Sequence, residues 1–159
     1  MNNWLQHLDD GSLDPLIDNF QTDCYGFVYK ITNLETGKFY IGRKSFIHNK
    51  KKKLTKKELA EQPITRGRKQ TTKVEQVDSG WKDYYGSSKE LLTDLKILCK
   101  DKFERVILQF CSTKKQLTYY EIYYQITYGV LHTTNSYNDN MLGKFFRKDF
   151  ATQEIDVIL

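Results

Sequence analysis

The pattern of apolar and polar positions is most regular between Gly26 and Lys44, where it has the period of two that is typical of β-strands. Large apolar side chains occupy alternate positions in the first half of this stretch, namely Phe27, Tyr29 and Ile31. The segment Asn33–Gly37 has the composition of a turn, and Gly37 is free to take a positive φ angle. Residues 38–42 form the returning run. The pattern therefore predicts a central β-hairpin.

Later segments alternate between helical and strand-like patterns. Residues 88–100 place leucines on one helical face, and residues 113–128 predict a second helix. Between them, residues 103–110 read FERVILQF, which predicts a third strand rich in branched side chains. This strand is expected to pair with the hairpin in a three-stranded antiparallel sheet, the minimum for independent stability. The predicted fold class is therefore α+β, with a small three-stranded antiparallel sheet flanked by helices in a single domain.

Both ends of the chain are expected to pack on a central domain at residues 25–140, which carries a basic insertion at residues 45–80. Residues 1–24 include Asp14-Pro15, a pair suited to the start of a helix, so this segment is expected to be a helical extension. It has five aspartates and no lysine or arginine, which predicts a position away from nucleic acid. Residues 141–159 are expected to form a closing helix and tail.

Composition limits the class of protein. A chain of 159 residues, with 39% hydrophobic and 14% aromatic residues, is long enough for one folded domain. It has no run of about 18 apolar residues, and its acidic beginning lacks the pattern of a signal peptide, so a cytoplasmic protein is expected. The 3 cysteines have no paired spacing and the 3 histidines no ligand spacing, which argues against a zinc site or a disulfide framework.

The net charge of +5 is unevenly distributed along the chain. Residues 43–73 contain twelve lysines and arginines against two glutamates, whereas the rest of the chain has five more acidic than basic residues. This polarity favours a polyanionic partner over a merely solvated surface. Within the basic stretch, Thr55 and Glu58 predict a short capped helix, and residues 65–72 predict a polar loop. The side chains expected to bind DNA phosphates are Lys50, Lys51, Lys52, Lys53, Arg66, Arg68 and Lys69.

Two tyrosines, Tyr29 and Tyr40, lie eleven residues apart on the two strands of the predicted hairpin. Tyrosine favours half-buried strand positions, so each of them taken alone is more often structural. Together, Val28-Tyr29 and Tyr40-Ile41-Gly42 resemble the signature hairpin of the GIY-YIG nucleases. That family includes phage and intron homing endonucleases, restriction enzymes and a bacterial excision-repair nuclease subunit. One position departs from the pattern, because Phe27 stands where the family name has glycine.

Two residues beyond the hairpin also match this family. Glu121 is a single acid among the aromatic residues of the second predicted helix, where a carboxylate either points outward or stays charged by meeting a cation. The family carries its metal-binding glutamate on a helix after the third strand, so the resemblance implies this role for Glu121. Asn138 follows a tyrosine and resembles the family's terminal asparagine, which helps to organise the site. Asn135 and Asn140 lie nearby in a sequence typical of turns.

The aromatic segment from Trp81 to Ser88 has two interpretations. It either packs as a turn that leads into a helix, or it stacks Trp81 on nucleic acid beside the active site. Its Tyr84–Ser88 part resembles a segment of phage members of the nuclease family, which implies a position near the cleft. Trp81 is therefore also a candidate DNA-binding residue.

The resemblance implies a metal-dependent DNA endonuclease of phage or mobile-element origin that hydrolyses phosphodiester bonds with Mg²⁺ or Mn²⁺. Glu121 would hold the metal, and Tyr29 or Tyr40 would position or deprotonate the attacking water. A tyrosine acts as a base only if its pKa falls below the ordinary value of about 10. Arg43 and Lys44 are the nearby cations expected to lower that pKa or to stabilise the transition state.

The resemblance implies a catalytic arginine on a helix after the second tyrosine, but at that distance this chain has the lysine run near Lys50, so Arg43, Arg66 and Arg68 are all candidates. Arg43 is favoured because the end of a strand fixes its position, whereas Arg66 and Arg68 lie in the predicted loop. Two other classes of function stay open, namely a non-catalytic DNA-binding or inhibitory module with this fold, and a domain whose lysines bind an acidic protein. A homodimer is a further expectation, since one active site cuts two strands either as a dimer or by sequential nicks. Residues 141–159 are too short for the separate DNA-reading domain that homing members append.

Overall fold

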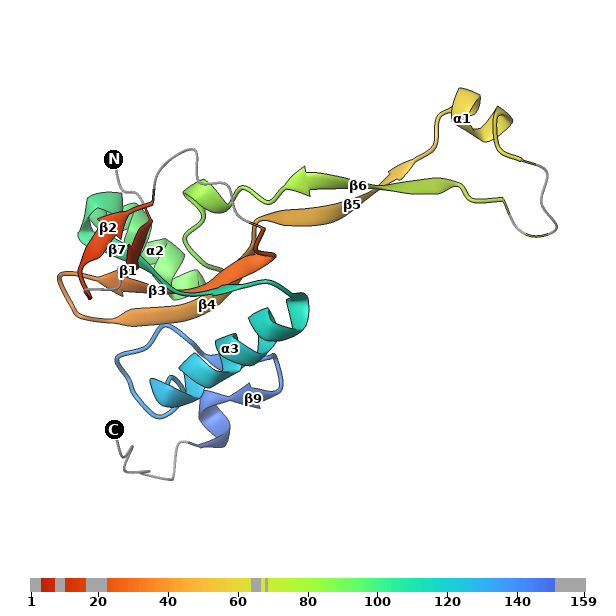
Figure 1. Cartoon of the computed structure of the whole chain (residues 1–159). Helices are drawn as coiled ribbons and strands as arrows, with labels where there is room; N and C mark the ends of the chain where they lie inside the picture. The colour runs from red at the N-terminus through yellow and green to blue at the C-terminus, as the bar shows by residue number, and fades with distance from the viewer. Residues whose placement is uncertain (1–3, 8–10, 17–22, 64–66, 68, 151–159) are drawn as a thin grey trace.

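The computed structural model describes residues 4–7, 11–16, 23–63, 67 and 69–150, and its centre is a mixed five-stranded sheet in the order β2-β1-β7-β3-β4 (Figure 1). The strands of this sheet are β1 (Leu5–His7), β2 (Leu13–Pro15), β3 (Gly26–Asn33), β4 (Phe39–Ser45) and β7 (Phe103–Cys111). The predicted hairpin forms from β3 and β4, with Tyr29 opposite Gly42. The third predicted strand, β7, pairs with β3 in antiparallel orientation, as expected. The predicted α+β class is therefore confirmed.

The prediction of three strands is wrong, because the N-terminal segment adds two more. Strands β1 and β2 lie where the sequence predicted short helices. Strand β1 pairs with β7 in parallel orientation. Trp4 and Leu16 are 2% and 5% exposed, so each anchors this segment in the core. The added strands cover the edge of β7, which would otherwise present unpaired backbone groups. Pro15 is tolerated because β2 is an edge strand.

Two helices cover opposite faces of the sheet (Figure 1). Helix α2 (Lys89–Leu98) packs Leu91 in one apolar cluster with Phe27 and Tyr29, whereas helix α3 (Lys114–Thr127) packs Leu117 in a second cluster with Val28. The alternation along β3 thus supplies both cores. Ser88 and Thr113 cap the two helices by accepting hydrogen bonds from the backbone amides of Leu91 and Gln116, respectively.

The basic insertion is an extended arm. Strands β5 (Ile47–Lys53) and β6 (Thr72–Asp78) pair only with each other and project from the body of the protein, with the short helix α1 (Lys56–Ala60) near the tip (Figure 1). The capping box predicted at Thr55 and Glu58 is confirmed. The polar loop predicted at residues 65–72 is confirmed at residues 67 and 69–71, which belong to no helix or strand, whereas Thr72 already belongs to β6. Residues 65, 66 and 68 lie outside the described residues.

The C-terminal part of the described chain is a small hairpin where a closing helix was expected. Strands β8 (Asn140–Met141) and β9 (Phe145–Phe146) pair with each other, and a single 3₁₀ turn at Arg147–Asp149 follows. The other 3₁₀ turns are Trp81–Asp83 and Lys100–Lys102. The predicted tail at residues 151–159 falls outside the described part of the chain. Across the described residues, no helix combines the length and apolar character needed to cross a membrane.

Candidate active site

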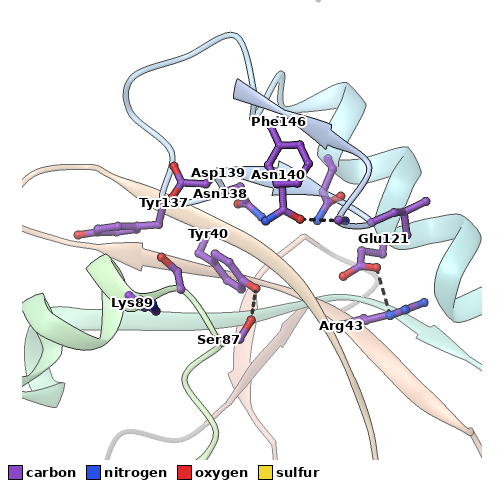
Figure 2. A pocket seen from close by; sticks show the side chains of 14 residues that line it. Tyr40, Arg43, Ser87, Lys89, Glu121, Tyr137, Asn138, Asp139, Asn140 and Phe146 are labelled. Atoms are coloured by element: carbon purple, nitrogen blue, oxygen red, sulfur yellow. Dashed lines mark hydrogen bonds and ion pairs between the residues drawn. The ribbon is translucent and has the colours of Figure 1, made fainter. Parts of the chain in front are cut away.

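An open cleft of about 690 Å³ lies between β4, α3, the start of α2 and the loop that follows α3 (Figure 2). Its walls include three residues that the sequence singled out, namely Tyr40, Arg43 and Glu121, and Asn138 lines it from the opposite loop. These residues come from three separate segments of the chain, namely β4, α3 and the loop after α3. The cleft is therefore the place where the fold gathers the candidate chemistry.

Arg43 and Glu121 form an ion pair at the wall of the cleft, with Arg43 Nε 3.1 Å from Glu121 Oε2. The same guanidinium donates from Nη1 to Thr118 Oγ1, one turn earlier on α3, so it bridges two side chains of the helix. The Glu121 side chain is only 14% exposed. Burial raises the pKa of Glu121, and the Arg43 charge opposes that rise. Of the two interpretations of Glu121, the structure supports a carboxylate that meets a cation.

The two signature tyrosines differ in their access to the cleft. Tyr40 lines it and shares a hydrogen bond of 3.1 Å with Ser87 Oγ, whereas Tyr29 is 1% exposed and packs in the core. Their ring centroids are 6.1 Å apart. Gly42 makes this arrangement possible, because a Cβ atom there would lie 2.6 Å from both the Tyr29 hydroxyl and Tyr40 Cε1. The glycine of the signature is thus a packing requirement of the tyrosine pair.

Burial raises the pKa of Tyr40 and raises that of Tyr29 well above its usual value of 10.0. The expectation that Arg43 and Lys44 would lower these pKa values is therefore not met in this structure. Lys44 does not line the cleft; its Nζ lies 4.0 Å from the centroid of the Tyr84 ring, and burial lowers its pKa. Tyr29 and Lys44 therefore contact the core and the Tyr84 ring, respectively, and neither lines the cleft.

Asn138 binds the backbone of the signature strand. Its Oδ1 accepts a hydrogen bond of 2.9 Å from the Ile41 amide, and its Nδ2 donates one of 2.8 Å to the Ile41 carbonyl. Because β4 is an edge strand, this side chain replaces a missing neighbour at the centre of the Tyr-Ile-Gly triplet. Asn135 and Asn140 instead bond to Gly37 and Gly143 in turns. Asn138 therefore binds both the amide and the carbonyl of Ile41 through the two ends of its side-chain amide.

Gln125 is a component of the site that the sequence analysis missed. It lies one turn after Glu121 on α3, lines the same cleft and is 4% exposed. Its Nε2 donates to the Ile41 carbonyl at 3.3 Å, and its buried Oε1 has no hydrogen-bond partner within the described residues. The spacing of four residues from Glu121 places both side chains on one helical face, and this was the available signal.

Arg147 is a second residue that sequence reasoning did not identify. Its Nη2 donates to the Ser136 and Asn138 carbonyls at 2.8 and 2.7 Å, and a further bond joins Nη1 to the Thr133 carbonyl. These contacts hold the loop that presents Asn138 to β4. No sequence pattern marks such a role, because the acceptors are backbone atoms brought together by the fold.

The predicted DNA-binding residues are distributed over several parts of the protein. Lys50, Lys51, Lys52 and Lys53 are all exposed on β5, and Lys69 is exposed near the tip of the arm. Arg66 and Arg68 lie outside the described residues.

Trp81 requires a correction. It is 8% exposed, its ring packs against Phe27 and Phe46, and its carbonyl accepts a hydrogen bond from Trp4 Nε1. Because its ring is enclosed by other aromatic side chains, Trp81 belongs to the core and offers no surface for stacking on DNA. The same cluster explains the departure at Phe27, since this strand position packs several aromatic rings where glycine would leave a void.

The hairpin with paired tyrosines and the glutamate on the helix after the third strand are the features that resemble the GIY-YIG nucleases. Comparison with protein families agrees: the family described as "Putative endonuclease segE, GIY-YIG domain" matches residues 12–145. The chain belongs to this family of endonuclease domains. No curated protein and no solved structure gives a significant match to the chain.

Proposed function

We propose that this chain is a metal-dependent DNA endonuclease that hydrolyses phosphodiester bonds in the cleft between β4 and α3. The observation that carries the proposal is the Arg43–Glu121 pair, because it places a permanent cation and a carboxylate 3.1 Å apart in the wall of the cleft. Phosphodiester hydrolysis needs both, one to neutralise the phosphate and one to hold a metal. Membership of an endonuclease family supports the same conclusion.

The residues of the cleft fit a hard divalent cation such as Mg²⁺ or Mn²⁺. The described residues contain no cluster of three or more acidic, histidine or cysteine ligands. Magnesium does not need one, since it is commonly bound by one or two carboxylates, substrate phosphates and retained waters. Glu121 would supply the carboxylate, and the unpaired Gln125 Oε1 would accept a hydrogen bond from a retained water. Bound there, the cation would polarise the phosphodiester and stabilise the leaving oxygen.

The chain's own groups orient the reaction. Arg43 would donate to a non-bridging phosphate oxygen through its planar guanidinium. Since burial raises the pKa of Tyr40, its hydroxyl remains protonated near neutral pH and would position water or phosphate by hydrogen bonding. Tyr29 would act indirectly by holding Tyr40 and β4 in place. The role of general base is therefore not assigned to either tyrosine.

The decisive experiment is cleavage of supercoiled plasmid by the full chain with Mg²⁺, with EDTA, and with the variant Glu121→Gln. Glu104→Gln is the matched control, since it makes the same chemical change on β7 outside the cleft. The proposal predicts cleavage that requires both the metal and Glu121 and that Glu104→Gln retains. Intact plasmid with salt-sensitive binding would instead support a non-catalytic DNA-binding module.

The time course of the same reaction addresses the oligomeric state. A homodimer that cuts both strands in one encounter converts supercoiled plasmid directly into linear DNA. A single chain that cuts one strand at a time accumulates nicked circles first. Sedimentation of the protein alone and with an uncleaved duplex then determines whether DNA brings two chains together.

A further inference from the structure

The β5–β6 ribbon has two faces of different chemistry. Residues opposite each other in an antiparallel pair share a face, and successive residues alternate between faces. One face, here called the amide face, consists of Ile47, Asn49, Lys51, Lys53, Thr72, Val74, Gln76 and Asp78. The other, here called the ion-pair face, consists of His48, Lys50, Lys52, Lys73, Glu75 and Val77.

The ion-pair face neutralises much of its own charge. Lys73 Nζ lies 2.7 Å from Glu58 Oε1 and 3.1 Å from Glu75 Oε1, and Lys52 Nζ lies 3.5 Å from Glu75 Oε2. On β6, the residues of this face are half-buried, whereas Val74, Gln76 and Asp78 of the amide face are exposed. Lys52 and Lys73 are thus committed to acidic partners on β6 and α1, whereas Lys50 forms no ion pair with the described residues.

The amide face is free and carries groups suited to base edges. Lys51 and Lys53 form no ion pair with any residue that the structure describes, and Asn49 stands opposite Gln76. Val74, opposite Lys51, is 57% exposed. In the major groove, asparagine and glutamine pair with adenine, lysine binds guanine O6 and N7, and apolar side chains contact the thymine methyl group. This combination differs from that of a surface that binds phosphates alone.

The shape and position of the ribbon fit the same partner. A two-stranded ribbon is marginally stable by itself in water, yet every residue of β5 is exposed, so β5 packs on no apolar surface among the described residues. The major groove admits a two-stranded β-ribbon. Strand β5 begins at Ile47, four residues after Arg43 of the cleft. At about 3.4 Å per residue its length is roughly 24 Å, which is less than the ~34 Å of one turn of B-DNA.

We propose that the amide face of the β5–β6 ribbon enters the major groove of duplex DNA within about one helical turn of the cut and reads base pairs there. The inference rests on the proposed function for its substrate. The ion-pair face points away from the bases, and its charges contribute only long-range attraction. The ribbon is thus a specificity element, and the cleft supplies the cutting site.

The first test compares two double variants with equal charge change on opposite faces, Lys51→Ala/Lys53→Ala and Lys50→Ala/Lys52→Ala. Binding to a mixed-sequence duplex is measured by fluorescence anisotropy in the Glu121→Gln background without metal, so that cleavage plays no part. The amide-face variant is expected to lose at least about tenfold more affinity than the ion-pair-face variant. Equal losses would show a sequence-blind electrostatic arm and would overturn the proposal.

The second test measures base reading directly. The full chain with Glu121→Gln selects sites from a random duplex pool, and Asn49→Ala/Gln76→Ala is compared with His48→Ala/Val77→Ala. The amide-face variant is expected to lose the base preference at about one to three positions, while the control keeps it. In addition, methylation of guanine N7, which lies in the major groove, is expected to block binding of the parent protein near the cut. Groove reading is refuted if the parent protein shows no base preference or if the amide-face variant keeps the preference of the parent. It is also refuted if methylation of guanine N7 leaves binding of the parent protein unchanged.

These binding tests remain decisive whatever the plasmid assay shows. If the chain binds duplexes through the amide face but never cleaves, the proposed function fails and the inference stands. If it cleaves with Glu121 dependence but both ribbon variants behave alike, the proposed function stands and the inference fails. Circular dichroism of each variant confirms that the exposed substitutions leave the fold intact.

Discussion

At Gly42 the backbone of β4 passes so close to two tyrosine rings that a side chain would collide with both. Gly42→Ala would place a Cβ atom 2.6 Å from the Tyr29 hydroxyl, and Tyr29 is 1% exposed and has little room to move. We expect a loss of about 1–3 kcal/mol in the free energy of unfolding, as in overpacked cores, together with displacement of Tyr40 from the cleft. Urea unfolding and the plasmid assay measure the two effects.

Gly80→Ala is the control for this substitution. Gly80 has a φ angle of +68°, but a Cβ atom there would meet nothing within 4 Å. We therefore expect a small loss of stability of about 1 kcal/mol from backbone strain and unchanged cleavage. Normal cleavage by Gly42→Ala would show that the position of Tyr40 is not set by this close contact.

Glu121 should make stability depend on pH. Because burial raises its pKa above the ordinary 4.5, the folded state favours the protonated carboxyl. The resulting stabilisation is fully present below pH 4.5 and is lost as the pH rises through the folded-state pKa. The side chain of Glu121→Gln stays neutral at every pH. As the pH rises from 4.5 through the folded-state pKa of Glu121, we therefore expect the free energy of unfolding of Glu121→Gln to increase relative to that of the parent chain. Urea unfolding of both proteins across the pH series measures the difference, and parallel curves would contradict the expectation.

Among the elements, those with local sequence signals could be predicted and those that depend on distant partners could not. The hairpin β3–β4, strand β7 and helices α2 and α3 follow from their own periodicity and caps. The three-residue strands β1 and β2 form by pairing, β1 with the edge of β7 and β2 with β1. No local sequence pattern predicts such a long-range pairing. Strand β5 is rich in lysine, a residue depleted in strands, and its pairing with β6 spans the whole insertion.

The same distinction applies to the site. Glu121 and Asn138 were identified because each has a family counterpart, and Arg43 because the end of a strand fixes its position; the structure brings all three to one cleft. Gln125 and Arg147 were missed because their roles consist of contacts with backbone atoms of distant segments. Trp81 was misjudged because an aromatic residue beside a glycine suits either a core or a stacking surface, and only the packing distinguishes them.

The loop after α3 depends on Arg147. Arg147→Gln removes the charged donor from the Thr133, Ser136 and Asn138 carbonyls, and bonds to charged groups contribute about 1.5–3 kcal/mol each. We expect lower stability and a reduced kcat at unchanged DNA affinity, because Asn138 loses its fixed position under β4. Lys148→Gln makes the same charge change at an exposed neighbour and should behave like the parent chain. Equal behaviour of the two variants would refute this role.

At the scale of the whole molecule, the arm differs from the rest of the protein in both net charge and architecture. The arm, residues 47–78, carries ten basic and four acidic residues, a net charge of +6, whereas the whole chain has +5, so the remainder has −1. The remainder contains the complete five-stranded sheet, both covering helices and the cleft. The proposed attraction to DNA and the proposed cutting chemistry thus fall in different parts of one chain, and they should be separable.

Replacing the arm with Asn-Gly tests this separation. The Ser79 amide already donates to the Phe46 carbonyl at 3.0 Å, which is the bond that closes a two-residue hairpin turn, so β4 can return to residue 79 without strain. We expect cooperative thermal unfolding like that of the parent chain, but DNA affinity at least about a hundredfold weaker at physiological salt. Since each lost phosphate contact reduces the slope of log K against log salt by about 0.9, the salt dependence should flatten as well. Metal- and Glu121-dependent cleavage should persist at low salt. Its complete loss from a folded shortened chain would show that the arm contributes to the chemistry itself, and unchanged affinity would show that DNA binds elsewhere.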